Sequence, residues 1–524
     1  MRSAIHAICR ALSADPSLVS AEPRHLRPRL AKLTPAMAGV SAGRWSNIKS
    51  LTLTALKRFG LKSMAGRSRE PLALEWEALR ALLPDRHWQS GLSRFMSYCT
   101  ARGVGPTAVT AETFVQFGQE VENYGFVRDP GGTYRDTCKL WNRAAGTIPG
   151  WPQQQVAIPD RRRHFAFALD DFPITFRADV ESFLSAGANP DVFSDSYCKP
   201  ASELTVRNRK GGILMAATAL VRSGIPIQQI TGLEVLVEIK HAKASLRFLY
   251  NRAGEKTTAK IYQIANLLKA IAQHYLRQPE EIVDQLRKQC KALKPESAGF
   301  TEKNRRCLRQ FADDRKLLNL LVLPERVLEQ VGRIGELRRR DAVRVELAIA
   351  TAILLNIPLR AANLAGLRLD QHLQFVGSRA FLSIAPDQTK NAVAIEAEIR
   401  ARLARQLDIY VKRYRPILIE APTPWLFPGE NGARRPPGSF GHQITDFVAR
   451  EAGLVMTPHQ FRHLAAKLYL DQHPDGGESV RRLLGHKSLQ TTMRYYRELE
   501  SVLAGRRYAA LLDELLAGGR KKAS

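Results

Sequence analysis

Apolar residues recur along most of the chain at helical spacing, in blocks separated by Gly- and Pro-rich segments. Within residues 41–61, the apolar positions Trp45, Ile48, Leu51, Ala55, Leu56 and Phe59 fall close to a 3.6-residue period. Residues 374–399 differ, because apolar and polar residues alternate there around turns, which indicates a β-hairpin or a three-stranded sheet. The sequence therefore predicts a multidomain, mostly α protein with one small antiparallel β-sheet.

Interruptions of the apolar pattern predict the domain boundaries. The stretch TIPGWPQQQVAIPDRRRHF holds three prolines, a glycine and an arginine triplet, which is typical of a linker. At roughly 100–200 residues per domain, 524 residues suggest about three or four domains. The predicted divisions are a basic N-terminal segment that is helical in part (1–70), a helical domain (71–155), a linker (156–174), a second helical domain (175–295), a domain of helices and the sheet (305–515) and a basic tail (516–524). Inside the first segment, residues 25–39 are expected to be irregular.

The two helical domains share a short pattern. SYCTARGVGPTAVTAETFV and TALVRSGIPIQQITGLEVL each read as a helix, an arginine, a glycine turn and a threonine. Thr110 lies seven residues after Gly103, and Thr231 lies seven residues after Gly224. Each threonine is expected to cap the next helix. A diverged duplication explains the pattern, and so does coincidence, because helix–turn–helix patterns are common.

The net charge narrows the class of partner. Seventy-nine Lys and Arg against fifty Asp and Glu give +29 at pH 7 and a pI near 10.2. An excess of this size favours a polyanionic partner, with nucleic acid first. A membrane surface is less favoured, because no separate basic amphipathic anchor is evident. In residues 1–70 alone, thirteen basic residues stand against three acidic ones.

The N-terminus and the cysteines bear on the compartment. No apolar run reaches the roughly 18 residues that a membrane span needs, and MRSAIHAICRALSADPSL has no secretory-signal pattern. The six cysteines are scattered without a CxxC pair, which suits reduced, packed thiols. We therefore expect a cytoplasmic protein.

The segment TPHQFRHLAAKLYLDQH concentrates candidate chemistry. Thr457 and Pro458 suit a helix start, and His459 and Arg462, three residues apart, share one helix face. Near a helix N-terminus this pair can bind a phosphate by charged hydrogen bonds. His463 completes an HxxxH pattern, but a metalloprotease needs a glutamate where Gln460 stands, and no third ligand has suitable spacing. The sequence therefore disfavours a metal site.

Four further positions stand out for their chemistry. Arg360 ends a buried apolar helix, where a charge needs a partner or a ligand. Lys390 lies at the tip of the expected hairpin, and Gly485-His486 begins a turn nine residues before Tyr495. Taken singly, each has a purely structural explanation: an ion pair, a solvated turn, a cap or a half-buried aromatic.

Taken together, these motifs resemble the catalytic domain of the tyrosine recombinases, the phage integrase family. IPLRAANLAGLRL, DQTKNAVA, WLFPGENG, TPHQFRHLAA and RRLLGHKSLQTTMRYY occur in the family's order over roughly residues 310–510. The resemblance implies a C-shaped DNA clamp, with residues 175–295 as a core-binding, SAM-like domain. It does not account for the chain before residue 160, where a duplication would make residues 71–155 a diverged repeat of that domain. The implied catalytic residues are Arg360, Lys390, His459, Arg462, His486 and the nucleophile Tyr495. Asn363 departs from the family, which commonly has an acid there to brace the first arginine.

The resemblance also implies a reaction. Tyr495 would cleave a DNA strand, leaving a 3′-phosphotyrosyl link and a free 5′-hydroxyl. Arg360 and Arg462 would bind the non-bridging oxygens, and His486 would donate a hydrogen bond to the phosphate. His459 would accept the tyrosine proton, while Lys390 would protonate the leaving oxygen. Arg379 remains an alternative to Lys390. No metal, nucleotide or other cofactor is expected.

The expected function is site-specific recombination or integration that moves a mobile element. The alternatives are relaxation of DNA by a type IB-like topoisomerase and a degenerate, non-catalytic DNA-binding protein. The expected partners are specific double-stranded DNA sites, a homotetramer on two duplexes and an accessory DNA-bending or directionality protein. A C-terminal helical face, which could dock on a neighbouring copy or on its own domain, comprises Leu499, Val502, Leu503, Tyr508, Leu511, Leu512 and Leu515.

Overall fold

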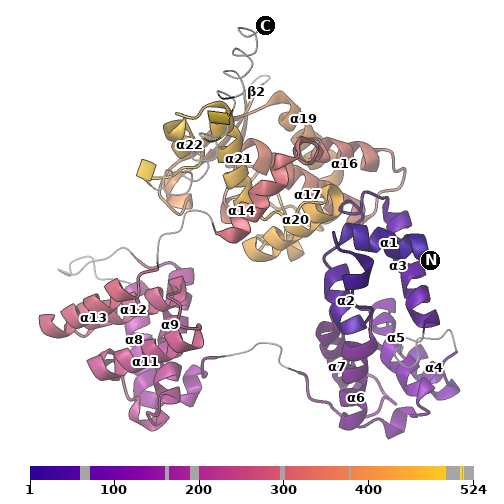
Figure 1. Cartoon of the computed structure of the whole chain (residues 1–524), viewed down its shortest axis with the longest axis horizontal. Coiled ribbons are helices and arrows are strands. Elements are labelled where there is room, and N and C mark those ends of the chain that lie inside the picture. Colours follow the sequence, from indigo (N-terminus) through magenta and orange to yellow (C-terminus); the bar gives the residue numbers. More distant parts are fainter. Residues whose placement is uncertain are drawn as a thin grey trace. The chain divides into compact units, whose positions relative to one another are not determined.

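The structure is a computed structural model of the chain. It describes residues 1–59, 71–159, 165–188, 200–295, 301–376 and 379–490, and the single positions 505, 508, 509 and 512. The chain forms two compact units, one made of Met1–Ile158 with Gly299–Ser524 and the other of Pro159–Ala298 (Figure 1). Helices dominate both units, and one small antiparallel sheet lies in the first. The predicted fold class, mostly α with a small antiparallel sheet, is confirmed. The domain boundaries given above stay predictions.

Three helices form the N-terminal segment: α1 (Arg2–Ala11), α2 (Pro23–Leu30) and α3 (Ala42–Arg58). The helix expected within residues 41–61 is therefore confirmed as α3. The prediction that residues 25–39 are irregular is wrong for their first part, which belongs to α2. Pro23 fits the first turn of α2, and the buried Arg27 guanidinium donates to the main-chain oxygens of Glu122 and Gly125 at 2.7 and 2.9 Å. These long-range bonds stabilise α2, a helix that the local sequence pattern does not predict.

An aromatic core organises the next four helices, α4 (Leu74–Ala81), α5 (Arg86–Ala101), α6 (Ala111–Tyr124) and α7 (Pro130–Thr147). Phe95 and Phe114 stack with ring centroids 4.1 Å apart, and Trp141 packs edge-on against Trp151. The Trp141 indole also donates to the Gln154 main-chain oxygen at 2.8 Å. The chain after α7 is thus packed against this core. Separately, the Thr34 hydroxyl, between α2 and α3, donates to the main-chain oxygen of Ala449 in α20 (Pro437–Ala452) at 2.7 Å.

The second unit is helical throughout its described part. It contains α8 (Ile174–Ala188), α9 (Glu203–Arg222), α10 (Leu233–Val237), α11 (Ile239–Arg252), α12 (Ala259–Ala270) and α13 (Glu280–Ala292). Their apolar faces share one buried cluster, which includes Phe176, Leu220 and Leu268.

The structure bears on the shared pattern of the two helical regions. Gly103 and Gly224 both adopt positive φ, at +65° and +106°, as glycine readily does. A 3-10 turn follows each at the same offset, Pro106–Ala108 and Ile227–Gln229, and is followed by a buried Val109 or Ile230. This shared corner fits a duplication. The two threonines that were expected to cap the next helices agree with this pattern only in part.

Thr110 caps α6 by accepting the Thr113 amide at 3.2 Å, as expected. Thr231 does not cap α10, because Gly232 occupies the N-cap position and the Leu233 amide donates instead to the Asp179 carboxylate of α8 at 2.6 Å. The cap prediction is therefore wrong for Thr231. A side chain from another helix has taken over the role.

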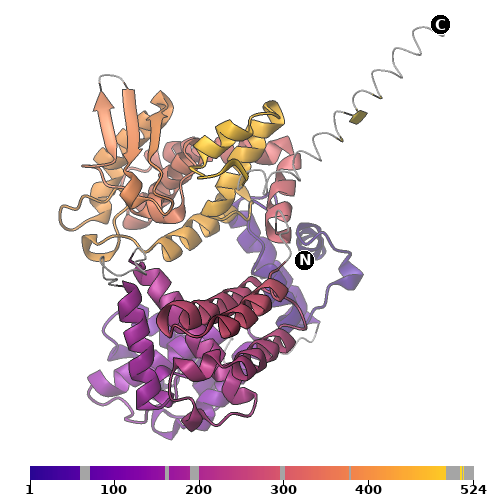
Figure 2. The same cartoon turned by 90° about the vertical axis from the view of Figure 1, so that its left-hand side faces the viewer.

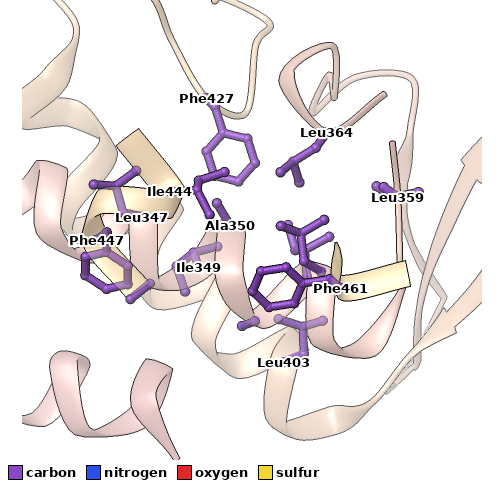
Figure 3. Packing of buried hydrophobic residues seen from close by; sticks show 14 of the residues in the cluster. Leu347, Ile349, Ala350, Leu359, Leu364, Leu403, Phe427, Ile444, Phe447 and Phe461 are labelled. Atoms are coloured by element: carbon purple, nitrogen blue, oxygen red, sulfur yellow. The ribbon is translucent and has the colours of Figure 1, made fainter. Parts of the chain in front are cut away.

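The C-terminal part of the first unit surrounds the long helix α17 (Arg339–Asn356), which is buried along most of its length. Around it lie α14 (Glu302–Arg309), α15 (Asp314–Leu321), α16 (Leu323–Gly332), α18 (Ala361–Ala365), α19 (Ala401–Ile409), α20 (Pro437–Ala452), α21 (Pro458–Gln472) and α22 (Gly477–Leu483). Figure 3 shows Leu347, Ile349 and Ala350 of α17 packed among Ile444, Phe447 and Phe461.

The sheet has the strand order β1 (Leu373–Val376), β2 (Arg379–Ile384), β3 (Ile395–Ile399), all antiparallel (Figure 2). In its register Leu382 stands opposite Leu373 on one side and Ala397 on the other. The three-stranded form of the predicted sheet is thus the observed one. The β2–β3 connection, residues 385–394, leads back toward the helices.

A buried ion pair joins α17 to the segment before α20. The Glu346 side chain is 1% exposed and pairs with Arg435, whose guanidinium also lies 4.5 Å from the Phe440 ring centroid. Burial raises the pKa of Glu346, while Arg435 acts in the opposite direction. Arg435 is thus the main partner that keeps this carboxylate charged inside the fold, with smaller help from Tyr410 and Arg339.

We expect Arg435→Met to lower the local unfolding free energy of this region by about 3–5 kcal/mol, because it leaves a buried carboxylate without its cation. Hydrogen exchange of the α17 amides in the full-length protein measures this change. The double variant Glu346→Leu/Arg435→Met is the control and should be less destabilised than Arg435→Met alone. Equal losses in the two variants would show that the pair is not the cause.

Candidate functional site

Arg462 connects three segments of the candidate site. It lies on α21, is only 3% exposed, and donates from Nη1 to the Pro358 oxygen at 2.6 Å and from Nη2 to the Leu484 oxygen. Two residues after these carbonyls come Arg360 and His486, respectively. A single buried guanidinium thereby fixes the main chain that carries two other predicted site residues.

The start of α21 is built to present His459 and Arg462 together. Thr457 is the N-cap residue and Pro458 begins the helix, as expected. The Gln460 side chain turns back to accept the Thr457 amide at 2.8 Å and donates to Asn304 at 3.2 Å. Gln460 is thus a buried structural residue. It holds the first turn of the helix from which the histidine and the arginine project.

Arg360 does not end the buried apolar helix as was expected: α17 ends at Asn356, and Arg360 is the half-buried N-cap residue of α18. Within the described part of the chain, its guanidinium makes no hydrogen bond or ion pair. Burial lowers the pKa of Arg360, which reflects the cost of holding this charge away from water. A half-buried arginine without an anion beside it is suited to a ligand that brings one.

Two histidines share the field of these arginines. His459 reaches solvent, yet burial of its ring and the charges of Arg462 and Arg360 lower its pKa. Burial, then Arg462, Arg360, His459 and Arg481, lower the pKa of His486 to about 4. Both imidazoles are consequently neutral at pH 7. Mutual influence among Arg360, Arg462, His459 and His486 shows that they lie together in one electropositive cluster.

The turn that carries His486 is fixed by the main chain. Gly485 adopts φ +57°, a left-handed conformation that glycine accepts at little cost. The His486 amide donates to the Arg481 oxygen at 3.0 Å, and Arg481 Nη1 donates back to the His486 oxygen at 2.9 Å. These bonds set the direction of the chain as it leaves α22.

Lys390 lies in the β2–β3 connection and is exposed. Its neighbour Asn391 donates to the Gly485 oxygen at 3.2 Å, which joins this connection to the His486 turn. Arg379, the alternative to Lys390, pairs with Val376 at the opposite end of β2. The contacts thus bring the Lys390 connection, and not Arg379, to the cluster.

Among the described contacts, Asn363 makes no bond to Arg360. Its buried amide instead donates to the main-chain oxygen of Gln388 at 3.3 Å, in the connection that carries Lys390. His372 also holds Gln388, by a side-chain contact of 2.7 Å. The sequence predicted no role for either residue, because His372 lies outside the quoted motifs and Gln388 is not one of the predicted catalytic positions of DQTKNAVA.

His463 is a buried structural histidine. It is 5% exposed, its Nε2 lies 3.2 Å from Asn304 Nδ2, and its ring meets His459 edge-on at 4.9 Å between centroids. Burial is the main cause that lowers the pKa of His463 to about 3. No group of three potential metal ligands occurs among the residues that the structure describes.

His463 should make stability depend on pH. Its pKa is about 3 in the folded state and about 6.5 when unfolded, so between these values only the unfolded chain binds the proton. Stability should therefore fall as the pH drops from 6.5 toward 3, by about 2 kcal/mol at pH 5 from this group. Hydrogen exchange of α21 amides at pH 7 and pH 5 measures it. His463→Gln should remove that share of the slope, and an unchanged slope would refute the assignment.

Several of the predicted residues lie outside the part of the chain that the structure describes. Tyr495, Tyr496 and most of the predicted C-terminal apolar face lie outside; of that face, Tyr508 and Leu512 are described, and both are exposed. In the described helices, none combines the length and the apolar composition that crossing a bilayer requires.

Comparisons with known proteins place the C-terminal region. Residues 327–501 match the sequence model described as the phage integrase family, and all six predicted catalytic positions lie inside this match. The tyrosine recombinase XerC of Staphylococcus haemolyticus is 25% identical over 260 residues, covering 49% of this chain and 76% of that protein. XerC of Bifidobacterium longum is 37% identical over 100 residues, covering 17% of this chain and 28% of that protein.

Solved structures with a similar backbone include two DNA complexes. One is a lambda integrase dimer bound to a COC′ core site, with 17% identity, coverage of 61% of this chain and 97% of that chain, and a TM-score of 0.36. The other is the XerH recombinase bound to its difH substrate, with 13% identity, coverage of 62% and 92%, and a TM-score of 0.31.

Proposed function

We propose, from the match of residues 327–501 to the phage integrase family, that the protein is a site-specific DNA recombinase that works through a covalent tyrosine–DNA intermediate. The observation that best supports the proposal is the position of Arg462. Its buried guanidinium ties down the segments of Arg360 and His486 while sharing a helix with His459. Such an electropositive cluster suits one phosphodiester group.

Cleavage would proceed by attack of the Tyr495 hydroxyl on phosphorus. The new bond is a 3′-phosphotyrosyl link, and the bond to the 5′-oxygen breaks. Free tyrosine has a pKa near 10, so removal of its proton needs assistance. His459 would accept this proton, because its lowered pKa leaves it neutral and ready as a base near pH 7.

The arginines and the lysine would handle the charge that develops. Arg360 and Arg462 would stabilise the non-bridging oxygens of the transition state, where negative charge increases. His486 would donate a further hydrogen bond to the phosphate. Lys390 would give its proton to the departing 5′-oxygen, so that a hydroxyl leaves instead of an alkoxide.

Rejoining would reverse these steps on another strand. The 5′-hydroxyl of the partner duplex attacks the phosphotyrosine, and Tyr495 is released. We propose that this exchange takes place between specific DNA sites in a homotetramer on two duplexes and serves integration, excision or transposition. The charge of +29 supports a DNA partner, and the helical regions upstream would supply further DNA contacts.

A two-site assay tests the proposal. Full-length protein is incubated with a supercoiled plasmid that carries two copies of the inverted repeats flanking its gene, and with a nicked suicide duplex of the same site. Recombinant circles together with a covalent adduct support recombination. Relaxation alone would favour a topoisomerase-like activity, and the absence of both an adduct and a recombinant would favour a non-catalytic DNA-binding protein.

A further inference from the structure

We propose that His372 and Gln388 form a latch, defined here as this side-chain pair, that sets the position of Lys390. They are positioning residues for protonation of the leaving strand. The inference rests on the proposed function and extends it to two residues outside the predicted catalytic set.

The hydrogen bonds of His372 select one tautomer. Its side chain is buried, and its Nδ1 lies 2.9 Å from the Arg368 amide nitrogen, which can only donate. Nδ1 must therefore be the acceptor, and the proton of the neutral ring sits on Nε2. Nε2 lies 2.7 Å from Gln388 Oε1, so it donates there. One neutral tautomer satisfies both contacts.

Gln388 is held at its side chain and at its main chain. Besides the bond from His372, its main-chain oxygen accepts the Asn363 amide at 3.3 Å. His372 itself is joined to the sheet, because the Ser383 amide of β2 donates to its main-chain oxygen at 3.0 Å. The latch thus connects the β2–β3 connection to both α18 and the sheet.

Lys390 lies between this latch and a second attachment. Thr389 is buried and bonds across the connection to Pro386 and Val393, at 3.0 and 2.8 Å, while Asn391 bonds to Gly485. The lysine is therefore an exposed residue of a segment that is fixed on either side. A general acid must lie within hydrogen-bond reach of the atom it protonates, and small displacements are costly.

A cavity of about 260 Å³ adjoins the latch and is lined in part by Asn363, His372, Gln388, Trp425 and Arg434. Packing is therefore incomplete on this side, and the connection depends on hydrogen bonds instead of close contact to keep its place. Loss of the latch gives Gln388 room to shift, and Lys390 would shift with it.

The test compares two suicide substrates. In one the scissile 5′-bridging atom is oxygen, and in the other it is sulfur, whose thiolate leaves without a proton. Gln388→Leu and His372→Phe should cleave the oxygen substrate roughly 10-fold or more slowly in single-turnover reactions, and the sulfur substrate at near the parental rate. Lys390→Ala should show the same rescue. Gln388→Glu, which keeps the acceptor, should retain cleavage of the oxygen substrate.

Gln371→Leu is the matched control, since Gln371 lines the same cavity without joining the latch, and it should leave both rates unchanged. Normal cleavage of the sulfur substrate also shows that a variant is folded. Equal slowing of the latch variants on both substrates, or no slowing on oxygen, overturns the latch. Lack of rescue for Lys390→Ala overturns it too, yet leaves the proposed function intact if the Tyr495 adduct forms. Absence of that adduct in the parental protein contradicts the function itself.

Discussion

Tyr495→Phe will bind its DNA site but form no covalent adduct, whereas Tyr496→Phe will form the adduct nearly as the parental protein does. Phenylalanine lacks the hydroxyl that attacks phosphorus, so the loss should reach the detection limit. Consecutive residues on a helix point about 100° apart, and only one of the two can face the phosphate. The spacing of nine residues from His486 selects Tyr495.

Trapping on a nicked suicide duplex, followed by denaturing electrophoresis, measures this result. Binding of an intact duplex is the control that separates loss of chemistry from loss of DNA affinity. Each variant is also the control for the other, because both remove the same atom. The reverse outcome, an adduct with Tyr495→Phe and none with Tyr496→Phe, would show that the assignment is off by one residue.

The second large effect is expected for Arg462→Lys, which should slow single-turnover cleavage by about 10²–10³-fold. Lysine keeps the charge but has no planar fork, so it cannot hold the Pro358 and Leu484 oxygens and a phosphate at once. The substitution weakens the phosphate contact. It also loosens the segments that present Arg360 and His486.

The sulfur substrate distinguishes this defect from that of Lys390. Arg462→Lys should stay slow on both substrates, because its loss concerns charge on phosphorus and not the leaving group. Arg482→Lys is the matched control. Arg482 lies on α22, is exposed, and among the described residues forms an ion pair with Glu478 near the surface. Such pairs contribute little, so this variant should cleave normally. If Arg462→Lys kept a third or more of the parental rate, the central role of Arg462 would be refuted.

The sequence predicted well what depends on local pattern or on family signature. The helical period of the apolar residues predicted α3, and the alternation in residues 374–399 predicted the sheet. The Thr457-Pro458 pair predicted the start of α21, the helix that carries His459 and Arg462. The predicted resemblance to the phage integrase family is confirmed over residues 327–501, and the similar proteins include a tyrosine recombinase. The individual catalytic roles stay predictions.

What the sequence could not predict consists mostly of bonds to main-chain oxygens far along the chain. Arg462 and Pro358 are 104 positions apart, and any residue type could offer that carbonyl, so no residue pattern marks the contact. The same holds for Arg27, whose bonds to Glu122 and Gly125 stabilise α2. The bond from Asn363 to the Gln388 oxygen could not be predicted either. A motif shows that an asparagine replaces the usual acid, but it does not show which group the asparagine contacts.

The neutral histidines beside Arg360 and Arg462 imply that DNA binding is linked to proton uptake. Burial of the two rings, and next the charges of Arg462 and Arg360, hold the pKa values of His459 and His486 down. A phosphate bound among them offsets the arginine charges and so raises both pKa values. Binding then draws protons from solution, so mildly acidic conditions tighten the grip on the scissile phosphate. Acidic conditions also protonate His459, so that it can no longer accept the tyrosine proton. Tighter binding of the phosphate is therefore expected to come with slower cleavage.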